Sequence, residues 1–496
     1  MPPLDSIWAL ALLLIDLLAV GLSAWHILLH KRTPSSALLW LNIVVLLPLV
    51  GTLLYVAFGV DRHGRRATIK ELHNLSVRQQ LTPMTRQVLP GPLQGDSPDD
   101  TMHEPLEADV FPDHLDPFAA LMARLGRYRA VGGNHLEFLD GGDAFYDRAL
   151  AAIDGATSFV LIETYIFDCD SVGMRFLDAL GRAAERGVQC ALLFDAVGSL
   201  DLDVLALDRT RGRGVRIHAF DQRSALRGRF QINLRNHRKV LVVDGLLGFT
   251  GGTNLSARHL AEAPDRSRSE DVHVVVRGPV VSQLTGVFAE DWFSTTGELL
   301  SEELYFPGCA QPDGSAICRV LPSGPDGDYG AFHSLIVAAI HGAGRSIDLV
   351  TPYFIPSEAV SMALQVAAMR GVRVTVIIPE ELDHWFVGQA TNSYLGPLLD
   401  VGVQIQRRPG AFLHAKVTVV DGLWALVGSS NVDPRGYWLN YELNLGIVGR
   451  DAVMPIVSWV DAQRERAVPV DPEAWRMRGL GVRAWENFWA LFSPLL

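Results

Sequence analysis

Two stretches of the chain carry the same pattern and decide its fold. Residues 236–245 read NHRKVLVVDG and residues 413–422 read LHAKVTVVDG, so each has a histidine, a lysine two positions later and an aspartate five positions after that. His237 and His414 are 177 residues apart, and an asparagine follows each of them by 17 positions, at Asn254 and Asn431. One such pattern recurs by chance, but two copies in equivalent surroundings indicate an internal duplication.

The residue types in each copy suit the chemistry of a phosphate group. VLVV and VTVV are typical of β-strands, in which residues i and i+2 point to the same face. His237 and Lys239 are therefore expected to project together, and so are His414 and Lys416. A lysine can bind non-bridging phosphate oxygens, and a histidine can attack phosphorus or move a proton.

An aspartate followed by glycine ends each copy, at Asp244 and Asp421. Asp-Gly is a turn signal, so each pair is expected to end its strand. The two carboxylates have two candidate roles, which are to order the catalytic site or to close the turn.

Strand and helix patterns alternate around both copies. In the first half, a short apolar run at 158–163 precedes helical spacing at 173–186, and Gly187 separates that helix from a second apolar run at 188–194. In the second half, apolar runs at 346–350 and 372–378 flank a helical stretch that ends at Gly371. This β-α-β order predicts an α/β fold with two similar lobes, each a mixed, mostly parallel sheet flanked by helices, and a site between them.

The N-terminal region contains two long apolar segments. Residues 7–29 are almost entirely apolar, and residues 37–60 contain no charge. As helices they would be about 34–36 Å long, enough to cross a hydrocarbon core of about 30 Å. A cleaved signal peptide is less well supported, since no Lys or Arg precedes the first segment and a second segment follows it. We expect a two-helix transmembrane hairpin.

The flanking charges favour one orientation of this hairpin. Five Lys or Arg follow the second segment between positions 62 and 78, whereas the turn between the segments carries Lys31 and Arg32. Because positive residues concentrate on the cytoplasmic side, we expect a multi-pass membrane protein with both termini and the long C-terminal portion in the cytoplasm.

Charge is distributed unevenly along the 496 residues. The formal net charge of −12 argues against a nucleic-acid partner. Eight acidic residues and no basic ones lie between Asp96 and Asp116, which is typical of a solvated linker. In contrast, residues 206–239 contain ten Lys and Arg against two acids, which favours an anionic lipid near the first motif. The expected organisation is a hairpin at 1–66, an acidic linker at 67–117, and lobes at 118–308 and 309–496.

No cofactor is expected from the sequence. The four cysteines have irregular spacing without a CxxC pair, so neither a disulfide framework nor a zinc site is indicated. There is also no Walker-type phosphate-binding loop and no spacing typical of metal ligands.

The duplicated motif resembles the signature of the phospholipase D superfamily. The apolar hairpin, residues 163–167 (ETYIF), residues 352–356 (PYFIP) and the terminal residues 493–496 (SPLL) extend this resemblance to the bacterial cardiolipin synthases of that superfamily. The resemblance covers nearly the whole chain apart from the acidic stretch. It implies a membrane-bound enzyme that forms cardiolipin and glycerol from two molecules of phosphatidylglycerol, without a metal and through a phosphohistidine.

The resemblance also implies roles for individual residues. His237 would be the nucleophile and His414 the general acid and base. Carboxylates after each motif would hydrogen-bond the histidines, and these correspond to Asp271 and Glu442; Glu270 is an alternative to Asp271, and ordinary acids at strand starts would look the same. The phosphoryl oxygens would be held by Lys239, Lys416, Asn254 and Asn431.

Other activities stay open at this point. A hydrolytic phospholipase D would use water as the acceptor, and a related transferase would take phosphatidylethanolamine as the donor. Both share the first half-reaction, so the motifs do not separate them. A nuclease is disfavoured by the hairpin and the acidity, and a non-catalytic membrane scaffold by the two intact motifs. The oligomeric state is not indicated.

Overall fold

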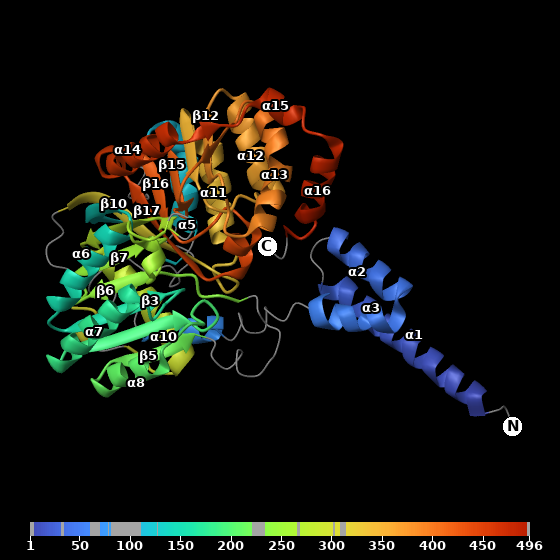
Figure 1. Cartoon of the computed structure of the whole chain (residues 1–496), viewed down its shortest axis with the longest axis horizontal. Coiled ribbons are helices and arrows are strands. Elements are labelled where there is room, and N and C mark those ends of the chain that lie inside the picture. Colours follow the sequence, from blue (N-terminus) through green and yellow to red (C-terminus); the bar gives the residue numbers. More distant parts are fainter. Residues whose placement is uncertain are drawn as a thin grey trace. The chain divides into compact units, whose positions relative to one another are not determined.

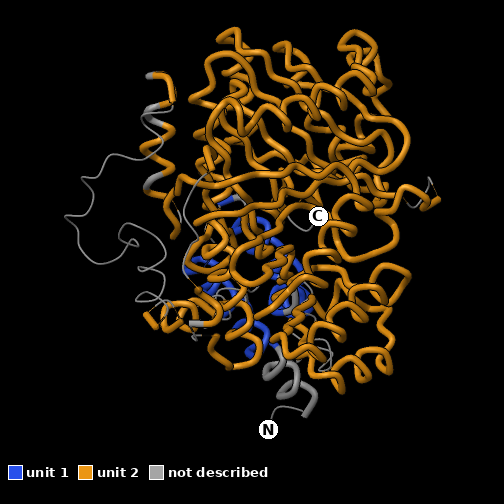
Figure 2. Tube along the Cα trace, turned by 90° about the vertical axis from the view of Figure 1, so that its left-hand side faces the viewer, with its two compact units in different colours: residues 1–69 blue, residues 70–496 orange. Residues whose placement is uncertain are grey.

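A computed structural model describes residues 4–30, 34–59, 70–77, 79–80, 111–125, 127–220, 234–264, 268–300, 303–307 and 314–493. The chain divides into two compact units, Met1–Ile69 and Lys70–Leu496, which Figure 2 distinguishes by colour. The first unit contains the apolar N-terminal helices, and the second contains both copies of the motif.

The first unit is built around one long apolar helix, α1 (Leu4–His30). Among the described helices, it is the one long and apolar enough to cross a membrane, with a mean hydropathy of 1.7 over Leu13–His30. Its apolar side chains point outward: Leu17, Leu22 and Trp25 are 61%, 62% and 65% exposed. Because water does not stabilise so large an apolar surface, this helix suits a lipid environment.

The second apolar segment is not one continuous helix. It forms α2 (Pro34–Leu46) and α3 (Pro48–Leu54), followed by a π-helical turn, η1 (Tyr55–Gly59). The break falls at Pro48, because proline lacks an N–H and disfavours helical backbone at the residue before it. Both α2 and α3 contact α1. The 13 residues of α2 span about 20 Å, less than a bilayer core. In the described residues, the expected second span at 37–60 is thus two short helices and a π-helical turn instead of one continuous helix.

Each lobe of the second unit is built on one large sheet, and several strands of both sheets are labelled in Figure 1. The strand order is the same in the two sheets. In lobe one the order is β2 (His135–Asp140), β9 (Val272–Arg277), β7 (Leu247–Gly251), β6 (Val240–Val243), β3 (Phe159–Thr164), β4 (Gln189–Asp195) and β5 (Arg216–Phe220). In lobe two it is β10 (Gly314–Ser323), β17 (Glu442–Val448), β16 (Trp424–Gly428), β15 (Val417–Val420), β11 (Ser346–Val350), β12 (Arg373–Pro379) and β13 (Gln404–Arg408). The predicted duplication is thus a duplication of topology.

The sheets are mixed, as predicted, but they are not mostly parallel. Parallel pairing is confined to β3-β4-β5 and β11-β12-β13 among these strands, and the other neighbours are antiparallel. The motif strands explain the difference. Asp-Gly turns join β6 to β7 and β15 to β16, and such short connections produce antiparallel hairpins.

Local sequence signals set the helices that connect the parallel strands. The side chain of Asp170 caps α7 (Ser171–Glu185), and that of Ser357 caps α12 (Glu358–Met369), each by accepting a backbone N–H of the first turn. Gly187 and Gly371 follow these helices with φ of 91° and 89°, a conformation that favours glycine. Both β-α-β units predicted from the sequence are confirmed.

The remaining helices cover the two sheets. Lobe one has α6 (Gly142–Asp154), α8 (Val204–Gly212), α10 (Val280–Thr296) and the short η4 (Ala257–His259) and η5 (Glu303–Tyr305). Lobe two has α11 (Ala331–Gly342), α13 (Trp385–Asp400), α14 (Arg450–Arg466), α15 (Pro472–Arg476), α16 (Leu480–Ala490) and η6 (Arg435–Leu439). Val240 and Val242 of β6 point into a core shared by both lobes, whereas Leu241 and Val243 point into a core under α6 and α7.

The chain enters lobe two before it forms lobe one. The short η3 (Asp113–Leu115) and α5 (Asp116–Arg124) pack on lobe two, and β1 (Val131–Gly133) pairs with β10 at one edge of its sheet; β18 (Val468–Pro469) closes the other edge. Residues 70–77 are helical, and Lys70 at their start is buried against Asp291 at 2.7 Å. The boundary at 118 therefore separates segments that pack together. The acidic residues from Asp96 to Asp109 lie outside the described residues.

Candidate active site

Two short pairings between the lobes position the histidines. β14 (Phe412–Leu413) pairs with β8 (Ser269–Glu270), and Asn236 forms an equivalent bridge with Tyr441. The backbone N–H of His237 donates to the Tyr441 carbonyl at 2.8 Å, and that of His414 donates to the Glu270 carbonyl at 2.7 Å. Each motif therefore lies against the other lobe, beside the residue that precedes Glu442 or Asp271.

These pairings give each histidine a carboxylate from the opposite lobe. His237 Nδ1 lies 2.9 Å from Glu442 Oε2, and His414 Nδ1 lies 2.6 Å from Asp271 Oδ2. With Nδ1 engaged by a carboxylate, Nε2 is the nitrogen left for chemistry, and the partner fixes the ring and its tautomer. The sequence indicated the four residues but not that the pairs cross between lobes.

Burial controls the charge of these groups. It lowers the pKa of His237, despite the opposing effect of Glu442. Burial and then the nearby Lys416 and Lys239 hold the pKa of His414 well below its usual value. Burial alone would raise the pKa of Glu442, but His237 and Lys239 outweigh it and keep that pKa below the ordinary value. Both imidazoles are therefore neutral at neutral pH while Glu442 is ionised.

Each lysine side chain is hydrogen-bonded to the backbone carbonyl of the histidine in its own motif. Lys239 Nζ donates to the His237 carbonyl at 2.7 Å, and Lys416 Nζ donates to the His414 carbonyl. Both follow the histidine in an extended segment just before β6 or β15, not within the strand itself. Burial lowers the pKa of Lys239 to about 7 and that of Lys416 to about 8. A phosphate anion would favour their charged forms.

Both histidines and both asparagines line one cavity of about 490 Å³. Asn254 Oδ1 accepts a hydrogen bond from the Ile166 N–H at 3.2 Å. Asn431 Oδ1 is buried and, among the described residues, has no hydrogen-bond partner. The cavity thus brings together the imidazoles and amides that the duplicated motif predicts, one set from each lobe.

Asp244 and Asp421 lie away from this cavity, which corrects the expectation that they are catalytic. Each is seven residues beyond its histidine, on the order of 20 Å along an extended chain. Their φ angles are 54° and 56°, so both occupy the left-handed turn position. Their carboxylates accept hydrogen bonds from three successive backbone N–H groups, at Thr157, Ser158 and Phe159 for Asp244 and at Gly344, Arg345 and Ser346 for Asp421. Their role is to close the turn and hold the start of the neighbouring strand.

The two carboxylate pockets differ in detail. Ser429 donates its hydroxyl hydrogen bond to Glu442, and the Asn440 side chain donates to the other oxygen of Glu442 at 3.0 Å. The position equivalent to Ser429 is Gly252, where a Cβ would overlap the Asp271 carboxylate. The shorter acid therefore pairs with glycine, and the longer acid with serine.

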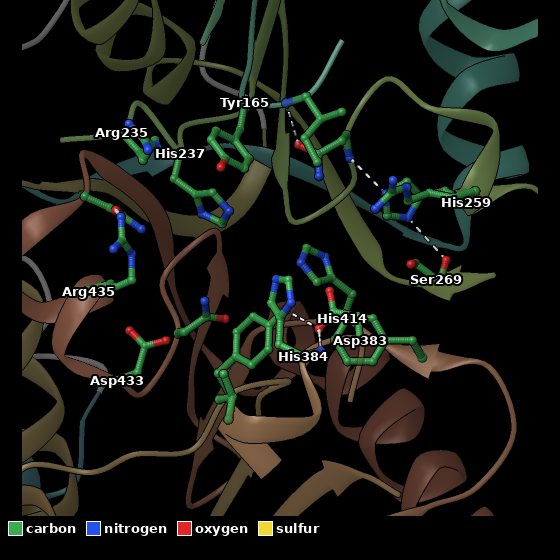
Figure 3. Close-up of a pocket in the computed structure, with 18 of the residues that line it drawn as sticks. Tyr165, Arg235, His237, His259, Ser269, Asp383, His384, His414, Asp433 and Arg435 are labelled. Carbon is green, nitrogen blue, oxygen red and sulfur yellow. Dashed lines mark hydrogen bonds between the residues drawn. The ribbon is translucent and has the colours of Figure 1, made fainter. Parts of the chain in front are cut away.

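Several cavity residues were missed from the sequence (Figure 3). Arg235 and Arg435 lie on one side of the histidines, and His259 and Ser269 lie on the other. The duplication contained a signal for two of them, since Arg258 and Arg435 each follow their asparagine by four positions. Other missed residues that line the cavity include Tyr165, Asp383, His384 and Asp433. Of the basic segment at 206–239, positions 221–233 lie outside the described residues.

Asn236 and Arg238, the two neighbours of His237 in the chain, take part in a buried ionic network. Arg238 Nη1 lies 2.6 Å from Asp291, which also pairs with Lys70, and the Asn236 side chain donates to Glu163. Burial alone would raise the pKa of Asp291, but Arg238 and Lys70 hold it below its usual value. Burial raises the pKa of Glu163 well above the ordinary value, and the nearby Asp291 raises it further. In the part of the chain that the structure describes, no group of three His, Cys, Asp or Glu side chains is arranged as a metal site.

Comparisons with known proteins show the family to which the chain belongs. The family described as "Cardiolipin synthase, PLD-like domain" matches residues 149–292 and 336–464, and the family described as "Phospholipase_D-nuclease N-terminal" matches residues 17–59. A cardiolipin synthase A of Pseudomonas putida is 35% identical over 494 residues, with 97% of both chains covered. One from Pseudomonas fluorescens is 33% identical over 479 residues, with 96% of both covered. The crystal structure of phosphatidylserine synthase from Haemophilus influenzae has the same fold, with a TM-score of 0.59, 14% identity, and coverage of 77% of this chain and 100% of that one.

Proposed function

The chain belongs to the cardiolipin synthases of the phospholipase D superfamily, and we propose that His237 and His414 carry out its chemistry. It joins two molecules of phosphatidylglycerol to form cardiolipin and glycerol. The observation that carries the assignment of the site is the crossed pairing of each histidine with a carboxylate of the other lobe, beside one shared cavity.

In the first half-reaction, His237 Nε2 attacks the phosphorus of the donor lipid. A nitrogen–phosphorus bond forms, and the bond from phosphorus to the terminal glycerol oxygen breaks. That oxygen takes a proton from His414 and leaves as glycerol. Glu442 stabilises the charge that develops on His237, and Asp271 does the same for protonated His414.

In the second half-reaction, a second phosphatidylglycerol replaces the departed glycerol. Its terminal hydroxyl gives its proton to His414, and the oxygen attacks phosphorus and displaces His237. The products are cardiolipin and the enzyme with His414 protonated, as it is when the donor lipid is bound. The atoms balance, and each histidine returns to the state that it has in the donor complex.

Lys239, Lys416, Asn254 and Asn431 would stabilise the transferred phosphoryl group. Two ammonium groups and two amides from equivalent positions suit the negative charge on the equatorial oxygens of the transition state. The negative charge of an arriving phosphodiester also offsets the positive field of the two lysines at His414. Protonation of His414 therefore becomes easier when the lipid is bound. The buried lysines thus link substrate binding to the acid step.

The protein associates with the membrane through its N-terminal unit. We further propose that the unit is inserted with the catalytic lobes in the cytoplasm, which the five basic residues between positions 62 and 78 support. A protease added to sealed inside-out membrane vesicles should then digest the lobes, whereas the same protease outside right-side-out vesicles should leave them intact.

The decisive experiment uses purified protein, labelled phosphatidylglycerol in vesicles and a metal chelator. Wild-type protein should form labelled cardiolipin and release glycerol, and His237→Ala and His414→Ala should not. Equal cardiolipin formation by all three proteins would refute the assignment. Phosphatidic acid as the main product would instead favour the hydrolytic phospholipase D, and a parallel assay with phosphatidylethanolamine tests the alternative donor.

A further inference from the structure

Two arginines from different lobes lie together on one wall of the catalytic cavity. Arg235 precedes His237 by two residues, and Arg435 begins η6 four residues after Asn431. Both line the cavity, and Figure 3 shows them on the same side of the two histidines. Neither is used by the phosphoryl transfer described above.

The backbone holds both arginines in place. The Arg235 carbonyl accepts the Tyr441 N–H at 2.8 Å, and the Arg435 carbonyl accepts the Asn440 N–H at 2.9 Å. Asn440 also donates to Glu442, the partner of His237. The arginine wall is therefore connected through one short segment, residues 440–442, to the side of the site where His237 acts.

Two positive charges lie close together on this wall. Arg235 is only 7% exposed, and Arg435 is half-buried. Burial lowers the pKa of Arg435, Asp433 and Glu442 oppose that change, and the neighbouring Arg235 lowers the pKa further, so the two guanidinium charges are close enough to repel each other. Among the described residues that line the cavity, Asp433 is the acid next to these arginines, and burial raises its pKa to about 7, so it is only partly ionised at neutral pH. An anion placed here would relieve the repulsion.

The wall also breaks the symmetry of the duplication. A shift of 177 residues relates His237 to His414, and the same shift relates Arg258 to Arg435 and Arg235 to Phe412. The duplication therefore relates the side of the cavity that has two arginines to a side that has one exposed arginine and an aromatic ring. Positive charge is therefore distributed unevenly between the two walls of the cavity, although the two histidines are equivalent in the duplication.

We propose that Arg235 and Arg435 bind the phosphodiester of the acceptor phosphatidylglycerol, which presents its terminal hydroxyl to the phosphohistidine. This inference rests on the proposed function of the site. The acceptor brings a second phosphodiester into a cavity that already holds one on His237, so it needs its own cations. Guanidinium groups suit this task because they bind phosphate oxygens in a bidentate manner.

The test separates the acceptor from the donor. Labelled phosphatidylglycerol is the donor, and two acceptors compete, namely unlabelled phosphatidylglycerol and glycerol, which has no charge. Transfer to glycerol regenerates labelled phosphatidylglycerol and exchanges its headgroup, which labelled glycerol reports. This glycerol exchange requires the first half-reaction and its reversal, but it does not require binding of a second phosphodiester. A variant that still catalyses the exchange is also shown to be folded.

Arg235→Gln and Arg435→Gln should lower cardiolipin formation about tenfold to a hundredfold, the cost of losing charged hydrogen bonds to a phosphodiester, while glycerol exchange changes less than about twofold. Arg235→Lys should have an intermediate effect. Arg258→Gln, on the opposite wall, should leave the ratio of the two products as in wild type. The surface variant Arg209→Gln controls for loss of positive charge alone.

Three outcomes would overturn the acceptor site. Both reactions could fall in parallel, which would assign the arginines to the donor or the fold. The product ratio could stay unchanged, or Arg258→Gln could shift it as much as Arg435→Gln does. Failure of the proposed function looks different, because wild-type protein would then give neither exchange nor cardiolipin.

Discussion

The two copies of the motif present the same side chains to the cavity but rest on different supports. Behind His237, the charged Arg238 is buried with Asp291 and Glu163. Behind His414, the position equivalent to Arg238 is Ala415, and the sheet register makes Val350 the equivalent of Glu163. The duplication keeps the histidine, lysine and asparagine of both motifs, whereas the residues packed next to them differ between the lobes.

This difference shows that the two histidines are not interchangeable in their surroundings. A buried ionic network holds its members in one arrangement but becomes costly when one partner is lost, whereas an apolar backing tolerates small changes. We therefore expect the half of the site in lobe one to be more sensitive to substitution. The predictions below test how far each half depends on its own support.

The largest expected effect is the loss of either histidine. His237→Ala and His414→Ala should each lower the rate of cardiolipin formation by about 10⁴-fold, as for removal of a nucleophile or its proton-transfer partner. The two should differ when labelled donor is mixed with enzyme and rapidly denatured. Because His414 acts in both half-reactions, label should build up slowly on His414→Ala protein, which keeps the nucleophile, and not at all on His237→Ala protein. The reverse pattern would exchange the two roles.

Removal of the buried Arg238 should lower the free energy of unfolding by more than a substitution of Ala415, the equivalent residue in lobe two. Arg238→Met leaves Asp291 and Glu163 without that cation, so the free energy of unfolding should fall by about 3–5 kcal/mol. Ala415→Gly should cost about 1 kcal/mol. Denaturant titration measures both. Equal losses would mean that the two supports do not differ in this way.

Loss of either histidine-orienting carboxylate should reduce kcat by about 10²–10³-fold. Glu442→Gln and Asp271→Asn keep the shape of the side chain but remove the charge that stabilises an imidazolium. Because the pairs cross between lobes, Glu442→Gln combined with His414→Ala should slow trapping of the labelled intermediate relative to His414→Ala alone, whereas Asp271→Asn in the same background should not. If Asp271→Asn slowed it instead, each carboxylate would act on the histidine of its own lobe.

The turn aspartates should affect stability and not chemistry. Asp244→Asn and Asp421→Asn weaken the acceptance of three backbone N–H groups and should each cost about 1–3 kcal/mol, with kcat changed less than about threefold. Burial alone would raise the pKa of Asp421, but His114 and the N–H donors hold it below its ordinary value. Its stabilising effect should therefore be complete above about pH 4 and be lost as pH falls through the lowered pKa. A thermal melt of each variant against pH measures this.

The smallest expected effect is a difference in titration between the two lysines. Lys239, with a pKa of about 7, should lose its proton about one pH unit before Lys416, with a pKa of about 8. Since the protonated forms bind phosphate, kcat/KM for phosphatidylglycerol should fall as pH rises from 7 to 9, by at most about tenfold per unit for each group. Lys239→Arg stays charged and should remove the first part of the decline, whereas Lys416→Arg should leave it. A flat profile would contradict this dependence.

The duplicated motif and hydrophobic patterning were enough to predict two lobes, both β-α-β units and the two histidines and two asparagines that meet in the cavity. They could not predict the crossed pairs, because Glu442 and Asp271 reach their histidines through strand pairing between lobes. They also predicted a catalytic role for Asp244 and Asp421, which lie away from the cavity. A repeated motif does not show which of its residues face the cavity. The break at Pro48 was visible in the sequence, but hydrophobicity alone does not indicate a bend.

The crossed pairing of histidine and carboxylate has an evolutionary consequence. When residue i of one half contacts residue j of the other, and j contacts i in return, the contact has the form of a two-fold symmetric dimer. In such a dimer one gene encodes both halves, so a substitution must appear on both sides at once. Joining the halves in a single chain removes that constraint. It allows arginine at position 235 and phenylalanine at position 412, and a symmetric ancestor could not have made that distinction.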